Sequence, residues 1–252
     1  MLIDVHAHLD LIKDLDDVIK RAEDANIKLI ISAGIDPKTN KEVLRLAEKY
    51  SIIKPALGIY PLDALEKENN KEYSFDVDEE IEFIRSQKDK IIAVSEFGLD
   101  YLSENADKER QKEIFLKLLK LAKEIDKPVI VHTRKAETEV IEILKREQMK
   151  KVVLHCFCGK KSLIKKAAEL GYYFSIPPII VNSQQFQNLV KEVNLKQILT
   201  ETDSPYLSPY PGKINEPAFI SETIEKIAEI KELSIQEVEE QIFKNAKKLF
   251  SF

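Results

Sequence analysis

The chain has few of the residues and patterns that mark several common protein classes. Its two cysteines, Cys156 and Cys158, are too close together for an easy disulfide and too few for a structural zinc cage. Its six glycines contain no Gly-x-Gly-x-x-Gly motif, which argues against an open dinucleotide-binding sheet. We expect two unpaired small thiols, buried or half-buried, in a reducing compartment.

Charge and hydropathy exclude further classes. The net charge of -5 lacks the basic excess of proteins that coat duplex nucleic acid, although it suits an enzyme that grips one strand end through metals. No apolar run approaches the length of a membrane span, and no secretory leader pattern follows Met1. A hydrophobic content of 44% with 33% charged residues is typical of a water-soluble globular protein. We therefore expect a cytoplasmic protein with no membrane segment and no obligate protein partner.

Short apolar runs alternate with amphipathic stretches of helix length along the whole chain. The runs predict eight strands, at 2–5, 28–32, 53–57, 91–95, 129–132, 152–155, 172–176 and 197–200. Helical patterns lie at 15–25, 37–49, 77–87, 106–125, 137–147, 160–170 and 183–193, with a longer helix beginning near Pro217. The polar stretch 62–73 predicts a loop or short helix.

Repeated strand and helix units with near-continuous apolar strands predict a parallel sheet covered by helices. Eight such units close most economically as a single (β/α)8 TIM-type barrel, for which 252 residues is a usual length. Length alone also permits two small domains, and a doubly wound open sheet is the structural alternative. Because no linker, low-complexity tract or internal repeat divides the chain, we expect one hydrolase domain over 1–252.

The histidines gather at the ends of predicted strands. His6 and His8 are two residues apart, so on a strand they point to the same face and form a two-nitrogen pincer for a divalent ion. Two nearby histidines can equally be core or solvated residues. His132 and His155, however, end the fifth and sixth predicted strands and would enter the same mouth, where barrel active sites lie.

Two carboxylates follow the same rule. Glu96 closes the fourth predicted strand and Asp203 follows the eighth. A carboxylate beside apolar strand residues is costly to bury unless it is paired or bound to metal, whereas Asp10 and Asp100 better fit surface turns. Six candidate ligands suffice for two divalent ions, with Mg, Mn or Zn as candidates and positions left for water. These ligands are His6, His8, Glu96, His132, His155 and Asp203.

Residues near the candidate ligands allow two interpretations each. Arg134 can make a forked contact with a phosphate, or a salt bridge to a helix acid. Asp4 and Glu201 can accept hydrogen bonds from the N–H groups of ligand imidazoles or make hydrogen bonds at the bottom or rim of the barrel, and for Asp4 a position below the metals is favoured. Asn215 and Glu216 precede Pro217, so helix capping is favoured over substrate contact for both.

Three aromatic residues, Phe97, Phe157 and Tyr206, also lie near predicted strand ends. An aromatic ring there can stack on an unpaired base for roughly 1 to 3 kcal/mol. Core packing is the commoner fate of such residues and is favoured for them.

Six segments resemble, in order and spacing, the signatures of the TatD family of metal-dependent deoxyribonucleases, within the amidohydrolase-like barrels. They are HAHLD, EFGLDY, QKEIFLKLLKLAKEIDKPVIVHTR, HCFCG, ETDSPYL and NEPAFI. The resemblance covers nearly the whole chain and implies a two-metal hydrolase that cleaves DNA phosphodiesters, commonly from the 3' end. It implies that one ion is held by His6, His8 and Asp203. It also implies that His132 and His155 hold the other ion and that Glu96 bridges the two.

The chain departs from the family pattern at three positions. Tyr60 stands where the family commonly has a histidine, Ile214 where it has an arginine, and Ser95 where a glycine is frequent. Tyr60 and Ile214 lie in segments expected to touch the substrate. We therefore name Tyr60 and Arg134 as candidate substrate-binding residues.

The predicted reaction is hydrolysis of DNA, at strand ends or in single strands, by a water that two metal ions activate. Glu96 would hold the ions together, and Asp203 would orient the water and accept its proton, which makes both candidate catalytic residues. The alternative is an amidohydrolase-type enzyme that cleaves a small amide, lactone or phosphotriester. Many amidohydrolases place a carboxylated lysine on the fourth strand, where this chain has Glu96. A non-enzymatic binding protein is a third possibility, but no candidate ligand is missing.

Overall fold

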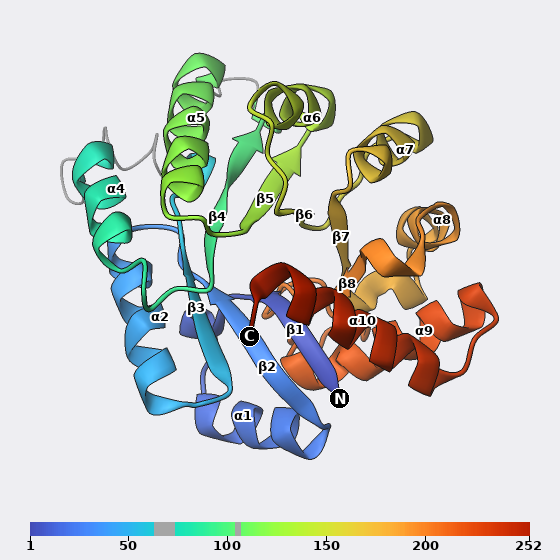
Figure 1. Cartoon of the computed structure of the whole chain (residues 1–252). Coiled ribbons are helices and arrows are strands. Elements are labelled where there is room, and N and C mark those ends of the chain that lie inside the picture. Colours follow the sequence, from blue (N-terminus) through green and yellow to red (C-terminus); the bar gives the residue numbers. More distant parts are fainter. Residues whose placement is uncertain (63–73, 104–106) are drawn as a thin grey trace.

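The computed structural model describes residues 1–62, 74–103 and 107–252. Eight parallel strands form one sheet in the order of the sequence, and helices surround it in a nearly closed (β/α)8 barrel (Figure 1). The strands are β1 (Leu2–Ala7), β2 (Ile27–Ala33), β3 (Ile53–Leu57), β4 (Ala93–Asp100), β5 (Val129–Arg134), β6 (Val152–Leu154), β7 (Tyr173–Ile176) and β8 (Ile198–Thr200). The predicted fold class is therefore confirmed.

The helices match the predicted ones to within a few residues, except at the C-terminal end. They are α1 (Leu15–Asp24), α2 (Pro37–Lys49), α4 (Val77–Ser86), α5 (Lys108–Glu124), α6 (Glu137–Arg146), α7 (Lys161–Glu169), α8 (Gln184–Glu192), α9 (Ile220–Lys231) and α10 (Ile235–Phe250). The single long helix predicted from Pro217 is wrong. A 3-10 turn at Pro217–Phe219 is followed by α9, which ends at Glu232 with φ of 55°, and a new helix then begins with a capping box at Ser234.

Two predicted strands are longer than expected. The first and fourth strands run beyond their predicted ends, to Ala7 and Asp100. The predicted connection 62–73 lies outside the described residues apart from its first position. Among the residues described, no helix has both the length and the apolar character needed to span a bilayer.

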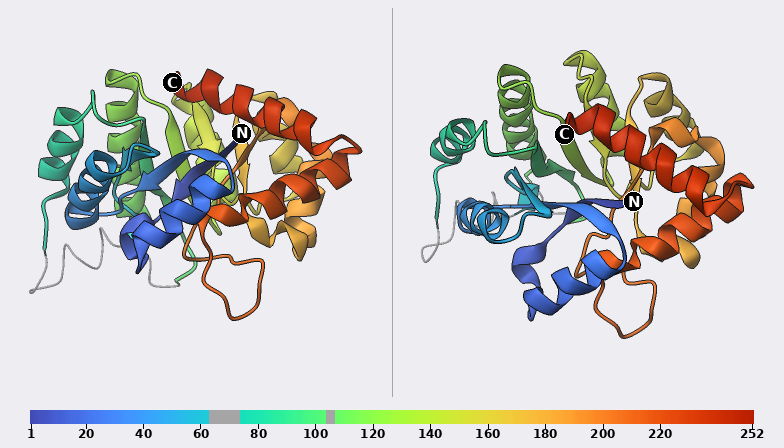
Figure 2. Two further views of the ribbon diagram at one scale, coloured as in Figure 1. Left: turned by 90° about the horizontal axis from the view of Figure 1, so that it is seen from below. Right: turned by 60° about the horizontal axis from the view of Figure 1, so that its bottom comes forward.

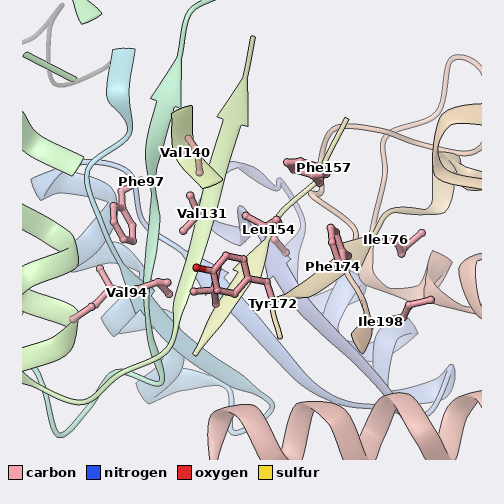
Figure 3. Close-up of a cluster of buried hydrophobic side chains, with 14 of the residues drawn as sticks. Val94, Phe97, Val131, Val140, Leu154, Phe157, Tyr172, Phe174, Ile176 and Ile198 are labelled. Carbon is pink, nitrogen blue, oxygen red and sulfur yellow. The ribbon is translucent and has the colours of Figure 1, made fainter. Parts of the chain in front are cut away.

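Two hydrophobic layers stabilise the barrel. The larger lies between the sheet and the surrounding helices, and Figure 3 shows part of it, including Phe97, Leu154 and Phe174. The smaller takes inward-facing residues from every strand, and Ala246, Leu249 and Phe250 of α10 complete it. Strand residues therefore alternate between an outer and an inner core, as expected for a barrel.

Helix α10 closes one end of the barrel. Leu249 and Phe250 border Lys54, Pro128 and Lys151, which lie at the starts of β3, β5 and β6. The N-terminal ends of the strands are thus covered. The opposite ends, where parallel barrels carry their active sites, stay open to a cavity.

Candidate metal centre

The inward side chains of β1 do not follow a simple alternation. Ile3 and Val5 belong to the inner core, so a regular strand would point the next inward side chain at Ala7. Ala7 instead packs in the outer layer, while His6 and His8 are buried with their rings on the inner side.

A β-bulge explains this reversal. Residues 4–7 of β1 advance three positions while the paired residues 30–32 of β2 advance two. One extra residue in a strand inverts every side chain that follows it. The bulge therefore turns both histidines into the barrel mouth. Below it the odd-numbered residues Ile3 and Val5 face inward, and above it the even-numbered histidines do.

A second bulge delivers Glu96. Ala93 faces the inner core, so strict alternation from it would turn Glu96 outward and Phe97 inward. Phe97 instead packs in the outer layer, which shows that the alternation is broken between the two residues. Residues 94–97 of β4 again advance three positions against two in 129–131 of β5. The extra residue turns the Glu96 carboxylate inward, where it is almost fully buried.

Gly58 leaves room for this second bulge. A Cβ added at Gly58 would lie 2.5 Å from the carbonyl carbon of Ser95 and 2.6 Å from the nitrogen of Glu96. No ordinary side chain fits at that approach. A residue that follows β3 thus decides where a residue of β4 can place its carboxylate.

The other two histidines need no bulge. On β5, Ile130 faces the inner core and His132 has the same parity. In β6, Val153 faces the inner core, and His155, the residue directly after the strand, has the same parity. Simple alternation carries both imidazoles inward at the carboxyl ends of their strands, as the sequence predicts.

The structure brings all six candidate ligands together around Glu96. Its Oε2 lies 3.2 Å from Nε2 of His8 and 3.6 Å from Nε2 of His6. Its Oε1 lies 2.8 Å from Nδ1 of His132 and 3.6 Å from Nε2 of His155. Each carboxylate oxygen therefore faces a different pair of imidazoles.

Asp203 joins the first pair only. Its Oδ1 lies 3.5 Å from Nε2 of His8 and 3.6 Å from Nε2 of His6. The backbone N–H of Asp203 donates to the carbonyl of His6 at 2.9 Å, so the end of β8 is fixed against β1. Donor atoms of these three residues all lie within 4.8 Å of one another.

The charge state of the cluster suits a cation. Burial lowers the pKa of His8, but Asp203 and Glu96 outweigh it and raise that pKa well above its ordinary value. Burial would raise the pKa of Glu96, yet the surrounding imidazoles hold it well below its usual range. The cluster thus keeps the Glu96 carboxylate ionised and stabilises positive charge beside it.

Two imidazole nitrogens are placed as metal donors would be. Nε2 of His6 and Nδ1 of His132 are buried, and neither makes a hydrogen bond of regular geometry within the described ranges. Each faces only carboxylate oxygens of the cluster, at 3.6 Å for His6 and 2.8 Å for His132. A buried nitrogen without a hydrogen bond is costly unless another group satisfies it. Four imidazoles and two carboxylates form a donor set that divalent transition metals favour, so the residues present fit a metal centre.

Glu201 supports one of the candidate ligands from behind. Its Oε2 lies 2.8 Å from Nδ1 of His155, and its Oε1 accepts from the N–H of Cys156 at 2.9 Å. Ser175 donates to the same carboxylate at 2.6 Å. Burial would raise the pKa of Glu201, but His155 and these donors lower it to about 2. The carboxylate fixes the ring so that Nε2 points into the site.

Asp4 has a different role from Glu201. Its carboxylate accepts from the backbone N–H groups of His6 at 3.2 Å and Thr202 at 2.9 Å, so it joins β1 to the segment after β8.

Ser95, which stands where the family frequently has a glycine, contacts a candidate ligand directly. Its Oγ lies 3.4 Å from Nδ1 of His6, while Nδ1 of His8 lies 3.3 Å from the carbonyl of Ala33.

Asp100 does not close a surface turn, so that prediction is wrong. It is fully buried at the end of β4, four residues and thus two strand periods beyond Glu96. Its Oδ2 accepts from the Tyr60 hydroxyl at 2.8 Å and from Nε of Arg134 at 2.8 Å, and lies 3.4 Å from Nε2 of His132. Asp100 is an even number of residues from Glu96, so both side chains face inward. Because the bulge decides which face that is, the strand pattern alone does not reveal this role.

Arg134 and Tyr60 both line the cavity with the candidate ligands. Arg134 pairs with Asp100 rather than with a helix acid, which corrects the salt-bridge interpretation. One of its terminal nitrogens also donates to the Tyr60 hydroxyl at 3.1 Å. Ile214 is 72% exposed and is not among the residues that line the cavity.

The cavity at the mouth has a volume of about 510 Å³, within the usual range for small-molecule sites. Its lining residues are His8, Leu11, Ile35, Tyr60, Glu96, His132, Arg134, His155, Asp203, Tyr206 and Leu207. Phe97 and Phe157 are buried in the outer core, as favoured from the sequence, whereas Tyr206 is exposed.

Asn215 is not a helix cap. Its buried side chain donates to the carbonyls of Thr202 and Tyr206, while Glu216 occupies the capping position of the following turn.

Both cysteines are free thiols. Cys156 is half-buried as expected, but Cys158 is exposed, so the prediction of a buried or half-buried thiol is wrong there.

A cluster of imidazoles and carboxylates at the carboxyl ends of a (β/α)8 barrel, facing a cavity, is the arrangement of a barrel-type metal-dependent hydrolase. Comparison with known proteins gives the family. The family described as TatD related DNase matches residues 3–251, and the chain belongs to it.

Individual relatives agree with this assignment. Deoxyribonuclease TATDN3 of Homo sapiens is 37% identical over 258 residues, covering 99% of this chain and 94% of the human protein. The uncharacterized metal-dependent hydrolase YabD of Bacillus subtilis is 35% identical over 261 residues, covering 99% of both chains. The crystal structure of YjjV, a TatD homologue from Escherichia coli, has a TM-score of 0.90 at 27% identity, covering 100% of this chain and 98% of that chain. The chain is a hydrolase, and its predicted resemblance to the TatD family is confirmed.

Proposed function

We propose that the protein hydrolyses DNA phosphodiesters with two divalent ions and removes nucleotides from the 3' end of a single strand. The observation that carries the two-ion proposal is the division of Glu96, whose two oxygens face separate pairs of imidazoles. The name of the human relative, a deoxyribonuclease, supports DNA as the substrate. The 3' to 5' direction rests on the family resemblance.

In this proposal His6, His8 and Asp203 hold one ion, and His132 and His155 hold the other. Glu96 would contribute one oxygen to each site. Divalent ions bound there would offset the negative charge of the phosphate and lower the pKa of water toward neutrality. We also propose that residues 1–252 act as one domain, because β1 is fixed to the segment after β8 and α10 completes the inner core.

The protein's own side chains complete the reaction. Asp203 is less buried than Glu96 and lines the cavity, so it can orient the attacking water and accept its proton. Glu201 stays ionised behind His155 and keeps that ring in one orientation. Arg134 and Tyr60 present a guanidinium and a hydroxyl at the cavity wall, where they would donate to phosphate oxygens.

The test uses purified protein loaded with Mg²⁺, Mn²⁺ or Zn²⁺ and DNA labelled at its 5' end, single-stranded or duplex. We expect stepwise shortening of the single strand from the 3' end, which stops when a chelator is added. Asp203→Ala should abolish it, whereas Asp16→Asn, which changes an exposed acid paired with Lys49, should not.

Other outcomes overturn the proposal. Turnover of a panel of small amides and lactones with intact DNA would select the amidohydrolase alternative. Internal fragments without a ladder would remove the exonuclease mode, and wild-type turnover by Asp203→Ala would remove its role as proton acceptor. Cytoplasmic location and independence of a protein partner stay predictions from the sequence.

A further inference from the structure

Tyr206 combines an exposed aromatic ring with a fixed backbone. Its residue is 55% exposed and it lines the cavity. The centroid of its ring lies 6.3 Å from that of His8, a candidate ligand. Large aromatic side chains contribute most to the stability of the fold when they are buried, so folding alone does not explain why this ring is exposed to solvent.

The segment that carries Tyr206 projects from the barrel between β8 and α9, as the orange loop in Figure 2 shows. Its first part is nevertheless held by buried hydrogen bonds. The Asn215 side chain donates to the carbonyl of Tyr206 at 2.6 Å and to that of Thr202 at 2.7 Å. The N–H of Tyr206 donates to the carbonyl of Asp203 at 2.9 Å. The backbone that carries the ring is thereby tied to the backbone of Asp203, a candidate ligand.

Other apolar side chains line the same cavity. Leu11 is 45% exposed, and Leu207 and Ile35 are half-buried. The floor, in contrast, is formed by imidazoles and carboxylates. The cavity therefore offers a charged surface and an apolar surface within a volume of about 510 Å³.

We propose that Tyr206, with Leu11 and Leu207, forms a subsite for an unpaired nucleobase next to the hydrolysed phosphate. The proposal rests on the proposed function and deepens it. A nucleotide has one charged group, which the floor would hold, and one flat apolar face, which an aromatic ring can stack against whatever the base. A paired base is already stacked within its duplex, so this subsite selects single strands or frayed ends.

The hydroxyl of Tyr206 plays no part in this proposal, because stacking needs only the ring. Tyr206→Phe should therefore retain binding, whereas Tyr206→Ala should lose it. For the apolar wall, Leu11→Ala is compared with Leu233→Ala, an exposed leucine that lies outside the cavity lining.

The first experiment measures binding without hydrolysis. Short single-stranded oligonucleotides carry fluorescent 2-aminopurine, whose emission is quenched by stacking, at either of the last two 3' positions. We expect quenching with wild type and Tyr206→Phe, and a Kd about 10-fold higher with Tyr206→Ala, as the loss of about 1.4 kcal/mol of stacking would give. Leu11→Ala should weaken binding, and Leu233→Ala should not.

The second experiment compares hydrolysis of oligonucleotides that have a normal base or a stable abasic residue at those two positions. We expect the abasic residue at one position to lower kcat/KM for wild type, and to have no further effect in Tyr206→Ala, because the two changes remove the same contact. If wild type cleaves both substrates equally, the stacking proposal fails while the proposed function stands. If no DNA is cleaved, the proposed function fails and the fluorescence titration decides the subsite. Equal quenching and equal Kd for wild type and Tyr206→Ala overturn it.

Discussion

The hydroxyl of Tyr60 donates a hydrogen bond of 2.8 Å to Oδ2 of Asp100, a carboxylate that is fully buried at the end of β4. The same oxygen accepts from Arg134 and lies 3.4 Å from Nε2 of His132. One carboxylate thus ties a candidate metal ligand to both candidate substrate-binding residues. Burial would raise the pKa of Asp100, but His132 and Arg134 hold it well below its usual range.

Replacing the Asp100 carboxylate should leave the His132 imidazole less firmly positioned. Asp100→Asn keeps the shape but removes the charge that faces His132 and Arg134, so we expect metal affinity to fall by about 10- to 100-fold, as for other partners of ligating histidines. Calorimetric titration with Mn²⁺ or Zn²⁺ measures it. Tyr60→Phe removes a neutral hydroxyl that donates to Asp100 and lies 3.4 Å from Nε2 of His132, but it keeps the charge of Asp100, so we expect a smaller fall in metal affinity than in Asp100→Asn. Unchanged affinity in Asp100→Asn would show that this carboxylate does not position His132.

Gly58 should be sensitive even to alanine. The new Cβ would meet the backbone of Ser95 and Glu96 at 2.5 to 2.6 Å, so the bulge must shift. We expect the free energy of unfolding to fall by about 1 to 3 kcal/mol and the metal affinity to fall with it. Urea denaturation and metal titration measure the two effects.

A matched glycine separates crowding from backbone strain. Gly171 has φ of +83°, and a Cβ there would meet nothing within 4 Å. Gly171→Ala should therefore cost about 1 to 2 kcal/mol through its left-handed backbone alone and leave metal affinity intact. Equal metal affinity in wild type and Gly58→Ala would mean that the bulge does not control the position of Glu96.

Glu201 predicts a pH dependence for protein kept free of metal by a chelator. Its pKa is about 2 in the folded protein and near 4.5 in an unfolded chain, so the folded state binds fewer protons between these values. The stability that the ionised carboxylate contributes is present above pH 4.5 and is lost as the pH falls toward 2. The shift corresponds to about 3 kcal/mol.

Urea denaturation at several pH values tests this linkage. In Glu201→Gln, where no carboxylate titrates, we expect a flatter stability profile between pH 4.5 and 2 than in wild type. Ser175→Ala removes one donor and should flatten it less. Parallel profiles for wild type and Glu201→Gln would contradict the assignment of this loss to Glu201.

Helix α10, which closes the N-terminal end of the barrel, should contribute to the stability of the fold without affecting the candidate metal centre. Leu249→Ala removes buried side chain from the inner core at the closed end of the barrel, so we expect a loss of about 2 to 5 kcal/mol. Metal affinity, measured in the variant below its unfolding transition, should match wild type. The exposed Leu233→Ala controls for loss of leucine at the surface. A large fall in metal affinity in Leu249→Ala would show that the two ends of the barrel are coupled.

Local pattern was enough for much of the fold and part of the site. The alternation of apolar runs and amphipathic helices predicted the barrel, because each unit must bury one face against the next. It also placed His132 and His155, whose strands are regular from the inner core to the mouth. The pattern failed at Glu232, where a left-handed residue divides the predicted final helix.

What the sequence determined by itself is the set of donors and the strand ends that carry them, since residue type and strand period are local properties. Which way His6, His8 and Glu96 point was decided only by the tertiary structure. His6 and Glu96 lie within a β-bulge and His8 follows one, and a bulge is defined by the register against a neighbouring strand rather than by the strand's own residues. Asp100 shares that dependence, because it lies beyond the bulge that turned Glu96 inward.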